Sequence, residues 1–143
     1  MARARLLPLF VFTLVACKDP ASEALDTAID EYDYERDGSR VILCYCPSAL
    51  GYATEAECEQ AIGDIGSAEK ACIVDAFDGR EQLGADYFEC ITTIQRSFAD
   101  CLDEFFDCAP DWYVMCQQTR DSEALDTCPT LPAGVAEAYA ACL

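Results

Sequence analysis

The sequence predicts an all-α fold, a small disulfide-stapled bundle of antiparallel helices around one long central helix. Apolar residues beyond residue 46 recur at three- and four-residue steps, which is the period of an α-helix. Ten cysteines follow residue 40, an even number that suits complete pairing into disulfides. The polar connections between the apolar stretches are short, and short connections favour antiparallel neighbours.

The first 17 residues have the organisation of an export signal. A basic stretch, Met1–Arg5, precedes an apolar stretch, Leu6–Val15, of the length typical of secretory signals. Leu14-Val15-Ala16-Cys17 then places a branched apolar residue at −3, a small residue at −1 and a cysteine at +1. These residues resemble the lipobox of bacterial lipoprotein precursors.

The resemblance implies that residues 1–16 are a signal peptide and that Cys17 is the lipid attachment site. The membrane would then be a partner through the covalent lipid, since two or more acyl chains anchor a protein stably. It also implies export to the bacterial cell envelope. Lys18 at +2, in place of aspartate, favours the outer membrane or the cell surface. The alternative is an ordinary cleaved signal peptide, with Cys17 in a disulfide.

Residues 17–40 differ in composition from the rest of the chain. The segment from Asp19 to Asp37 contains eight acidic residues and no cysteine. A short helix starting at Pro20 or Ser22 is compatible with it, but the segment as a whole is predicted to be a lipidated acidic tether. The cysteine-rich helical domain is then expected to span residues 41–143. Val41–Tyr45 is the one stretch of it that is compatible with a strand.

The first two predicted helices of the domain are short and have clear boundaries. Thr54-Glu55-Ala56-Glu57 is a capping box, and it predicts a helix that ends near Gly63. A second helix is expected to start at Gly66-Ser67 and to end at Asp78-Gly79.

The long central helix is predicted over residues 85–108. On a helical wheel its apolar residues share one face, and the acidic residues lie opposite. The apolar face contains Ile91, Ile94, Phe98, Leu102 and Phe105, and Cys90, Cys101 and Cys108 line one edge of it. Three cysteines in line on one helix cannot all pair with one another, so most are expected to reach neighbouring helices.

Two further helices complete the predicted bundle. Pro110-Asp111 precedes a helix in which Trp112, Met115, Cys116 and Thr119 recur at helical spacing. Pro132 suits the first turn of a last helix, with Val135, Tyr139 and Cys142 on one face.

Five disulfides are predicted among the ten remaining cysteines, because an exported chain folds in an oxidising compartment. These are Cys44, Cys46, Cys58, Cys72, Cys90, Cys101, Cys108, Cys116, Cys128 and Cys142. Cys44-Tyr45-Cys46 is too tight to bond to itself, so it is expected to join two different partners. The connectivity stays open. Metal binding is disfavoured, because the chain has no histidine and no C-x-x-C motif.

The cysteine spacing raises a duplicated helical unit as an alternative architecture. Cys46-x11-Cys58-x13-Cys72 matches the later series at an offset of 70 residues. That later series is Cys116-x11-Cys128-x13-Cys142. A threefold match among so many possible spacings also arises by coincidence.

The composition limits the possible functions. With 27 acidic and 9 basic residues, the formal net charge is −18, which disfavours nucleic acid as a partner. Without histidine, every His-dependent catalytic arrangement is excluded. We therefore predict a protein that is not an enzyme and has no cofactor. Its expected role is that of a cell-envelope or surface lipoprotein with a structural or protein-interaction function.

Two alternatives and one pair of candidate contact residues remain. The run Asp33-Tyr34-Glu35-Arg36-Asp37-Gly38 resembles the start of an EF-hand loop, which makes Asp33, Glu35 and Asp37 a weak calcium or cation site. Its twelfth position is Cys44 instead of a bidentate glutamate. A small carboxylate-dependent hydrolase is the second alternative. Tyr32 and Tyr34 are candidates for contact with an unknown protein or cationic partner, because the tether would expose them.

Overall fold

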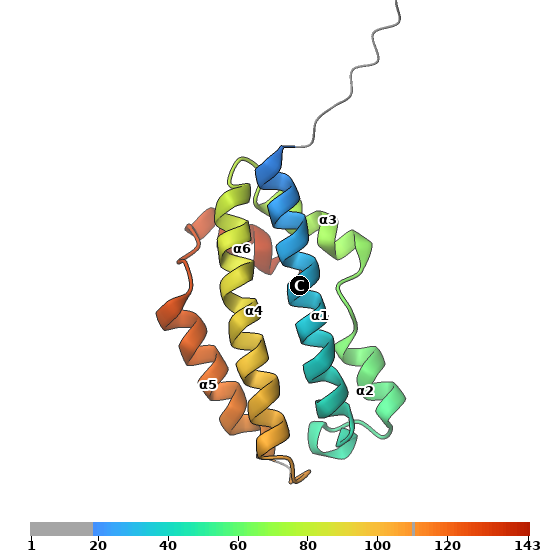
Figure 1. Ribbon diagram of the computed structural model, residues 1–143. Coiled ribbons are helices and arrows are strands. Elements are labelled where there is room, and N and C mark those ends of the chain that lie inside the picture. The colour runs from blue at the N-terminus through green and yellow to red at the C-terminus, as the bar shows by residue number, and fades with distance from the viewer. Residues whose placement is uncertain (1–18, 110) are drawn as a thin grey trace, which may run out of the picture.

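The computed structural model describes residues 19–109 and 111–143. The predicted signal peptide, the lipobox and Cys17 lie outside the described residues. The described chain is all-α, as predicted (Figure 1). Its elements are α1 (Pro20–Cys44), a 3-10 turn η1 (Pro47–Leu50), α2 (Glu55–Ile62), α3 (Ser67–Ala76), α4 (Glu81–Glu104), α5 (Trp112–Thr127) and α6 (Ala133–Ala140).

α1 is an integral helix of the bundle, so the prediction of an acidic tether over residues 17–40 is wrong from Pro20 onward. Leu25, Ala28 and Ile29 are buried on α1 and belong to the main hydrophobic cluster. Their three- and four-residue spacing is that of an amphipathic helix. Asp19 precedes α1, and none of the other seven acidic residues of this segment is buried. The acidic composition therefore concealed a regular apolar stripe.

The end of α1 also settles the one stretch considered as a strand. Val41–Cys44 forms the last turn of the helix, and Tyr45 caps it in the right-handed α conformation. The β-branched and aromatic residues there belong to a helix end, which packs against the bundle on one side and faces solvent on the other.

The two longest helices, α1 and α4, lie side by side and run in the same direction (Figure 1). Leu25 packs on Gly84, the ring of Tyr32 lies 5.7 Å from that of Phe88, and Cys46 bonds to Cys108. In these pairs the residue numbers rise together on the two sides, which is the pattern of parallel helices. The prediction of antiparallel neighbours concerns helices joined by short connections, and α1 and α4 are not such a pair, because η1, α2 and α3 lie between them and return the chain to the starting end. It is confirmed for α4 and α5, which are bonded through Cys90–Cys128 and Cys101–Cys116.

The short helices begin and end at the residues that the sequence indicates. The hydroxyl of Thr54 accepts a hydrogen bond from the Glu57 amide at 3.1 Å, and the Glu57 carboxylate accepts one from the Ala53 amide at 3.0 Å. Gly63 and Gly79 have positive φ angles, 35° and 68°, where the chain leaves α2 and turns from α3 into α4. Glycine accommodates such angles without the steric cost that a Cβ brings.

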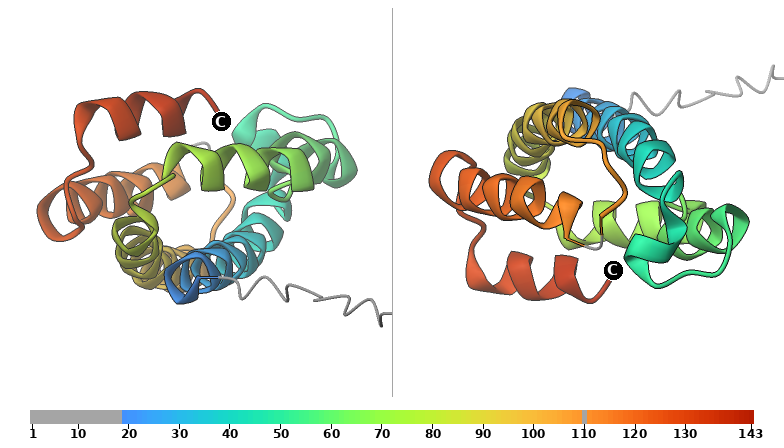
Figure 2. Two further views of the ribbon diagram at one scale, coloured as in Figure 1. Left: turned by 90° about the horizontal axis from the view of Figure 1, so that it is seen from above. Right: turned by 90° about the horizontal axis from the view of Figure 1, so that it is seen from below.

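Two hydrophobic clusters fill the bundle. The larger one lies toward the N-terminal ends of α1 and α4 and consists of Leu25, Ala28, Ile29, Ile73, Phe77, Ala85, Phe88 and Val135. The smaller one lies toward their C-terminal ends and consists of Cys46, Phe98, Leu102, Trp112 and Cys116. Seen along the bundle axis, α2 and α5 flank the α1–α4 pair, and α3 and α6 cover the remaining face (Figure 2).

Five disulfides join the ten described cysteines, as predicted. The pairs are Cys44–Cys58, Cys46–Cys108, Cys72–Cys142, Cys90–Cys128 and Cys101–Cys116, with Cα–Cα distances between 5.2 and 5.8 Å. The C-x-C pair has two different partners, and the three cysteines assigned to the long helix all bond to other elements. α4 itself ends at Glu104, and Cys108 lies beyond it with a φ of 56°.

The 70-residue offset in the cysteine spacing does not correspond to a structural repeat. Cys46 precedes η1 after the end of α1, whereas Cys116 lies within α5. Cys58 lies within α2, whereas Cys128 caps α5. Because matching cysteines lie in unlike elements, the spacing match is a coincidence.

Candidate functional site

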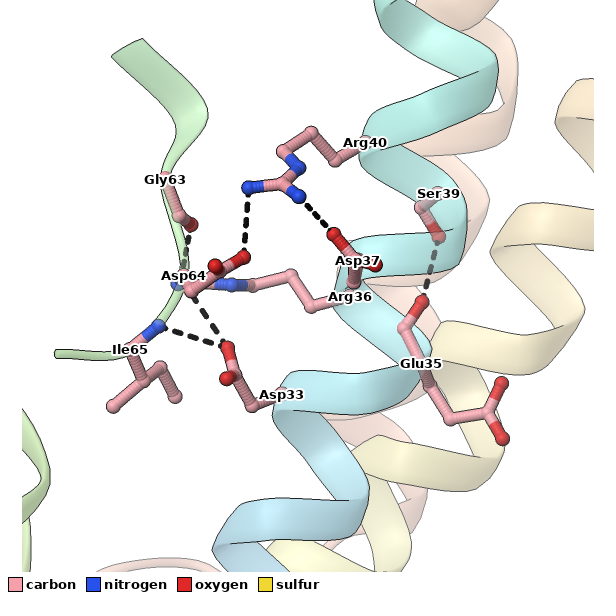
Figure 3. A network of polar contacts seen from close by, with 9 residues as sticks. All are labelled: Asp33, Glu35, Arg36, Asp37, Ser39, Arg40, Gly63, Asp64 and Ile65. Carbon is pink, nitrogen blue, oxygen red and sulfur yellow. Dashed lines mark hydrogen bonds and ion pairs between the residues drawn. The ribbon is translucent and has the colours of Figure 1, made fainter. Parts of the chain in front are cut away.

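The three carboxylates of the calcium-like run do not converge in the structure (Figure 3). Because they lie within α1, they follow the helix instead of a loop. Asp33 accepts a hydrogen bond from the Ile65 amide at 2.9 Å and lies 3.6 Å from the Arg36 guanidinium. Glu35 forms an ion pair with Arg96 of α4 at 2.7 Å. This geometry does not favour the alternative of a cation site at Asp33, Glu35 and Asp37.

Asp37 belongs to a network that fastens the α2–α3 loop to α1. Arg40 forms ion pairs with Asp37 and, at 2.7 Å, with Asp64 of the loop. Arg36 donates a hydrogen bond to the Gly63 carbonyl at 2.5 Å. These contacts satisfy the polar groups of a loop that would otherwise be held only by short helices. Within residues 19–109 and 111–143, no group of three metal-ligating side chains occurs.

Tyr32 and Tyr34, the predicted partner-binding residues, have different environments. Tyr34 is 77% exposed, as expected for a contact residue. Tyr32 packs against the main cluster, and its ring lies edge-on to Phe88. Burial raises the pKa of the Tyr32 hydroxyl, while Arg36 and Arg120 act in the opposite direction. The expectation that Tyr32 is exposed is wrong, because α1 is a packed helix.

A patch of exposed apolar side chains lies at the end of the bundle farthest from the start of α1. We call Val41, Tyr45 and Phe106 the distal patch; they are 40%, 65% and 45% exposed. Tyr45 and Phe106 meet edge to face, with ring centroids 6.5 Å apart. A shallow hollow of about 230 Å³ lies between them, and its walls include Ile42 and Asp103. Exposed aromatic residues grouped in this way are typical of interaction surfaces.

The disulfides hold the backbone on both sides of the distal patch. Tyr45 stands between Cys44 and Cys46, which bond to Cys58 and Cys108. The Cys46–Cys108 bond joins the two segments that carry Tyr45 and Phe106. The ring of Phe106 also packs edge-on to Trp112, at 5.3 Å. The aromatic surface is therefore presented by a cross-linked scaffold, which lowers the entropic cost of binding a partner.

The surroundings of the distal patch are acidic. The two stretches that form this end of the molecule, residues 41–63 and 97–119, contain eight acidic residues and no lysine or arginine. Asp103 borders the hollow directly. The negative potential at this end favours a positively charged partner and repels an acidic one.

Sequence reasoning did not identify the distal patch. The helical wheel assigned Phe105 to the buried face, but α4 ends one residue earlier, and both Phe105 and Phe106 are exposed. The sequence pattern indicated Tyr45 only as the residue between the two cysteines of the C-x-C motif. One signal in the sequence could have indicated the distal patch, namely an aromatic residue between two half-cystines. The two disulfides fix the backbone of such a residue, and the C-x-C motif itself offers its ring nothing to pack against.

Comparisons with known proteins do not place this chain in a family. No protein-family model, no curated protein and no solved structure matches it. Among the helices of the described residues, none is both long enough and apolar enough to cross a membrane.

Proposed function

We propose that this protein is a non-catalytic bacterial lipoprotein of the cell envelope that binds a protein partner through the distal patch. The patch is the observation that carries the proposal. Exposed aromatic side chains are costly on a soluble surface, and a partner that covers them would recover that free energy.

The lipobox and the disulfides support the location. Five disulfides among ten cysteines are consistent with an exported protein, since reducing compartments keep thiols free. The motif Leu14-Val15-Ala16-Cys17 supports lipid attachment at Cys17, and Lys18 favours the outer membrane or the cell surface. With ten sulfur atoms in disulfides, none of those cysteines serves as a nucleophile, which supports a non-catalytic role.

The length of α1 determines how the distal patch would be presented. α1 starts at Pro20, three residues after Cys17, so the bundle itself would stand at the membrane surface. A helix of 25 residues is about 37 Å long at 1.5 Å per residue. The distal patch lies at the far end of this helix and would point away from the bilayer.

The chemistry of the distal patch indicates the kind of partner. Its apolar centre and acidic surroundings suit a protein that presents apolar side chains flanked by lysine or arginine. A second copy of this chain is disfavoured, because two such ends would bring like charges together. No specific observation favours the cation-site alternative, since Asp33, Glu35 and Asp37 have separate hydrogen-bonding or ion-pair partners. No observation singles out a carboxylate pair for the hydrolase alternative.

Lipid attachment is tested by metabolic labelling with a fatty-acid analogue. The wild-type chain should incorporate the label and fractionate with membranes, whereas Cys17→Ala should do neither. Labelling that persists in Cys17→Ala would contradict the anchor.

Partner binding is tested by photo-crosslinking in intact cells. A photoreactive residue at position 45 or 106 should give one discrete adduct, and the same adduct from both positions. Position 125 is the matched control, because Leu125 is 84% exposed on α5 and lies outside the distal patch. The adduct should weaken as ionic strength rises, since attraction between opposite charges is screened. Equal adducts at all three positions, or an adduct with the mass of two copies of the chain, would contradict the proposal.

A further inference from the structure

A cavity of about 230 Å³ lies in the body of the bundle, remote from the distal patch. Four helices form its walls: α1 through Tyr32, α4 through Tyr87 and Gln95, α5 through Arg120, and α6 through Tyr139. Ile91, Ile94 and Ala124 provide its apolar surface. An apolar cavity of about 150 Å³ is large enough to hold benzene, so this space can hold one ring with small substituents.

Gln95 is a buried and oriented acceptor in this cavity. Its side chain is only 4% exposed, and its Nε2 donates a hydrogen bond to the Ser39 hydroxyl at 2.8 Å. Ser39 has one hydroxyl proton, which it donates to the Glu35 carbonyl at 3.4 Å. When that proton points to Glu35, the Ser39 oxygen accepts from Gln95, and the amide has the orientation in which Nε2 faces Ser39. The carbonyl oxygen Oε1 then has no hydrogen-bond donor among the described residues, and it is accessible to solvent, since the fully buried side-chain atoms without a partner are Arg40 Nε and Trp112 Nε1.

Water that enters the cavity can donate to Oε1 of Gln95, because this oxygen is not fully buried. A ligand with a hydrogen-bond donor at the same place would displace that water and keep the hydrogen bond. Burial raises the pKa of both Tyr87 and Tyr139, so their hydroxyls stay protonated near neutral pH and can donate as well as accept.

Arg120 provides the positive charge of the cavity. Its Nε and Nη2 both donate to the Asp121 carboxylate, at 2.9 and 2.8 Å, and its guanidinium lies 4.8 Å from the centroid of Phe98. These contacts position the guanidinium and leave Nη1 without a partner among the described residues. A carboxylate in the cavity can therefore receive a charge-assisted hydrogen bond.

We propose that this cavity binds a small organic carboxylate with a ring or other compact apolar body and a hydrogen-bond donor at its other end. The carboxylate pairs with Arg120, the donor meets Oε1 of Gln95, and the body lies among the tyrosine rings and the isoleucines. This site is independent of the distal patch and of the lipid anchor. It adds a small-molecule ligand to a protein whose proposed partner is a protein.

The test uses 4-hydroxybenzoate as the probe and 4-hydroxybenzamide as its uncharged match in shape. The full oxidised chain, in a non-ionic detergent, carries ¹³C in its tyrosine rings for NMR. We expect 4-hydroxybenzoate to shift Tyr32, Tyr87 and Tyr139 saturably and to leave Tyr34 and Tyr45 unchanged. The amide should bind at least about tenfold more weakly, because it lacks the charge that Arg120 recognises.

Two variants separate the cavity from general folding effects. Arg120→Gln should weaken 4-hydroxybenzoate at least about tenfold and remove its advantage over the amide. Ala124→Leu should abolish binding by filling the cavity, and Ala124 is partly exposed, so the fold should tolerate it. Arg96→Gln is the matched control, because Arg96 lies outside the cavity, and it should bind as the wild type does.

Three outcomes would overturn the proposal. One is the absence of saturable shifts up to about 10 mM probe, a concentration that detects even millimolar affinity. Another is equal affinity for the acid and the amide. The third is a set of shifts centred on Tyr45, which would mean adventitious binding of the additive at the distal patch only.

Discussion

At the scale of single residues, Gly84 matters because of the space that it leaves. A Cβ on Gly84 would lie 2.8 Å from side-chain atoms of Leu25 and Phe77. Both of these side chains are fully buried. The close approach of α1 to α4 at this point therefore requires a residue without a side chain, although glycine lowers the intrinsic stability of a helix.

We expect Gly84→Ala to lower the free energy of unfolding by about 1–3 kcal/mol, because the new methyl group overpacks the core. Gly38→Ala is the matched control in α1, where a Cβ meets nothing within 4 Å. It should raise the free energy of unfolding by about 0.5–1 kcal/mol through helix propensity alone. Urea unfolding of the oxidised proteins measures both changes. A stabilising effect of both substitutions would mean that the core repacks freely around Gly84.

Tyr139 links stability to alkaline pH. Burial raises its pKa in the folded state, whereas an unfolded tyrosine titrates near pH 10. The folded state therefore keeps a proton that the unfolded state loses above about pH 10. This contribution is fully present below that pH and is lost as the pH rises toward the folded-state pKa.

The free energy of unfolding should thus fall above about pH 10, by at most about 1.4 kcal/mol per pH unit for each retained proton. Tyr139→Phe has no proton to retain, so its decrease over the same range should be shallower. Urea unfolding at several pH values between about 8 and 11 measures the two slopes. Identical slopes would show that the other buried tyrosines dominate the effect.

At the scale of elements, α6 depends on one covalent attachment and a few aromatic contacts. Cys142 follows the helix and bonds to Cys72 of α3. Tyr139 packs against Phe77 and Phe88, with ring centroids 6.2 and 5.8 Å away. An eight-residue helix has little stability by itself, so these contacts hold it in the folded state.

Replacing both Cys72 and Cys142 with serine should lower the free energy of unfolding by about 2–4 kcal/mol. Cys72 is exposed and Cys142 partly exposed, so the serines can be hydrated. Hydrogen exchange should accelerate in α6 far more than in α5, which keeps its two disulfides to α4. Unchanged protection of α6 would mean that Tyr139 and Val135 are sufficient to hold it.

The sequence predicted those elements whose signals are local. The cap at Thr54 and the glycine at position 63 placed α2, because capping depends on a few adjacent residues. The in-line cysteines predicted bonds between helices for a similar reason. α1 was anticipated only as a short helix within a tether, because its apolar stripe is narrow and surrounded by acids. The distal patch was missed because α4 ends before Phe105, and helix ends depend on tertiary contacts.

At the scale of the whole molecule, the parallel arrangement of α1 and α4 lay beyond local signals. Residues 45–80 separate the two helices, and this stretch is long enough to return the chain to its starting end. The short connections indicate only how successive helices pack. They carry no information about α1 and α4, which pack together although they are not successive in the chain. For the same reason the sequence alone could not show that Tyr32, Gln95, Arg120 and Tyr139 line one cavity.

The disulfide pattern has a further consequence, which concerns how the protein matures. None of the five bonds joins cysteines that are neighbours along the chain; even Cys44–Cys58 passes over Cys46, and Cys101–Cys116 passes over Cys108. A chain that is oxidised as it emerges from a membrane meets neighbouring thiols first, so its early bonds would be non-native. Reaching the native set then requires thiol–disulfide exchange.

Refolding of the reduced chain should show this requirement directly. Oxidation by air without added thiol should yield mispaired isomers, whereas a mixture of reduced and oxidised glutathione should convert them to the native set over minutes to hours. Peptide mapping without reduction distinguishes the two products. A high yield of native bonds without added thiol would mean that the helices assemble before the cysteines react. Otherwise the cell that exports this protein has to supply an isomerase as well as an oxidant.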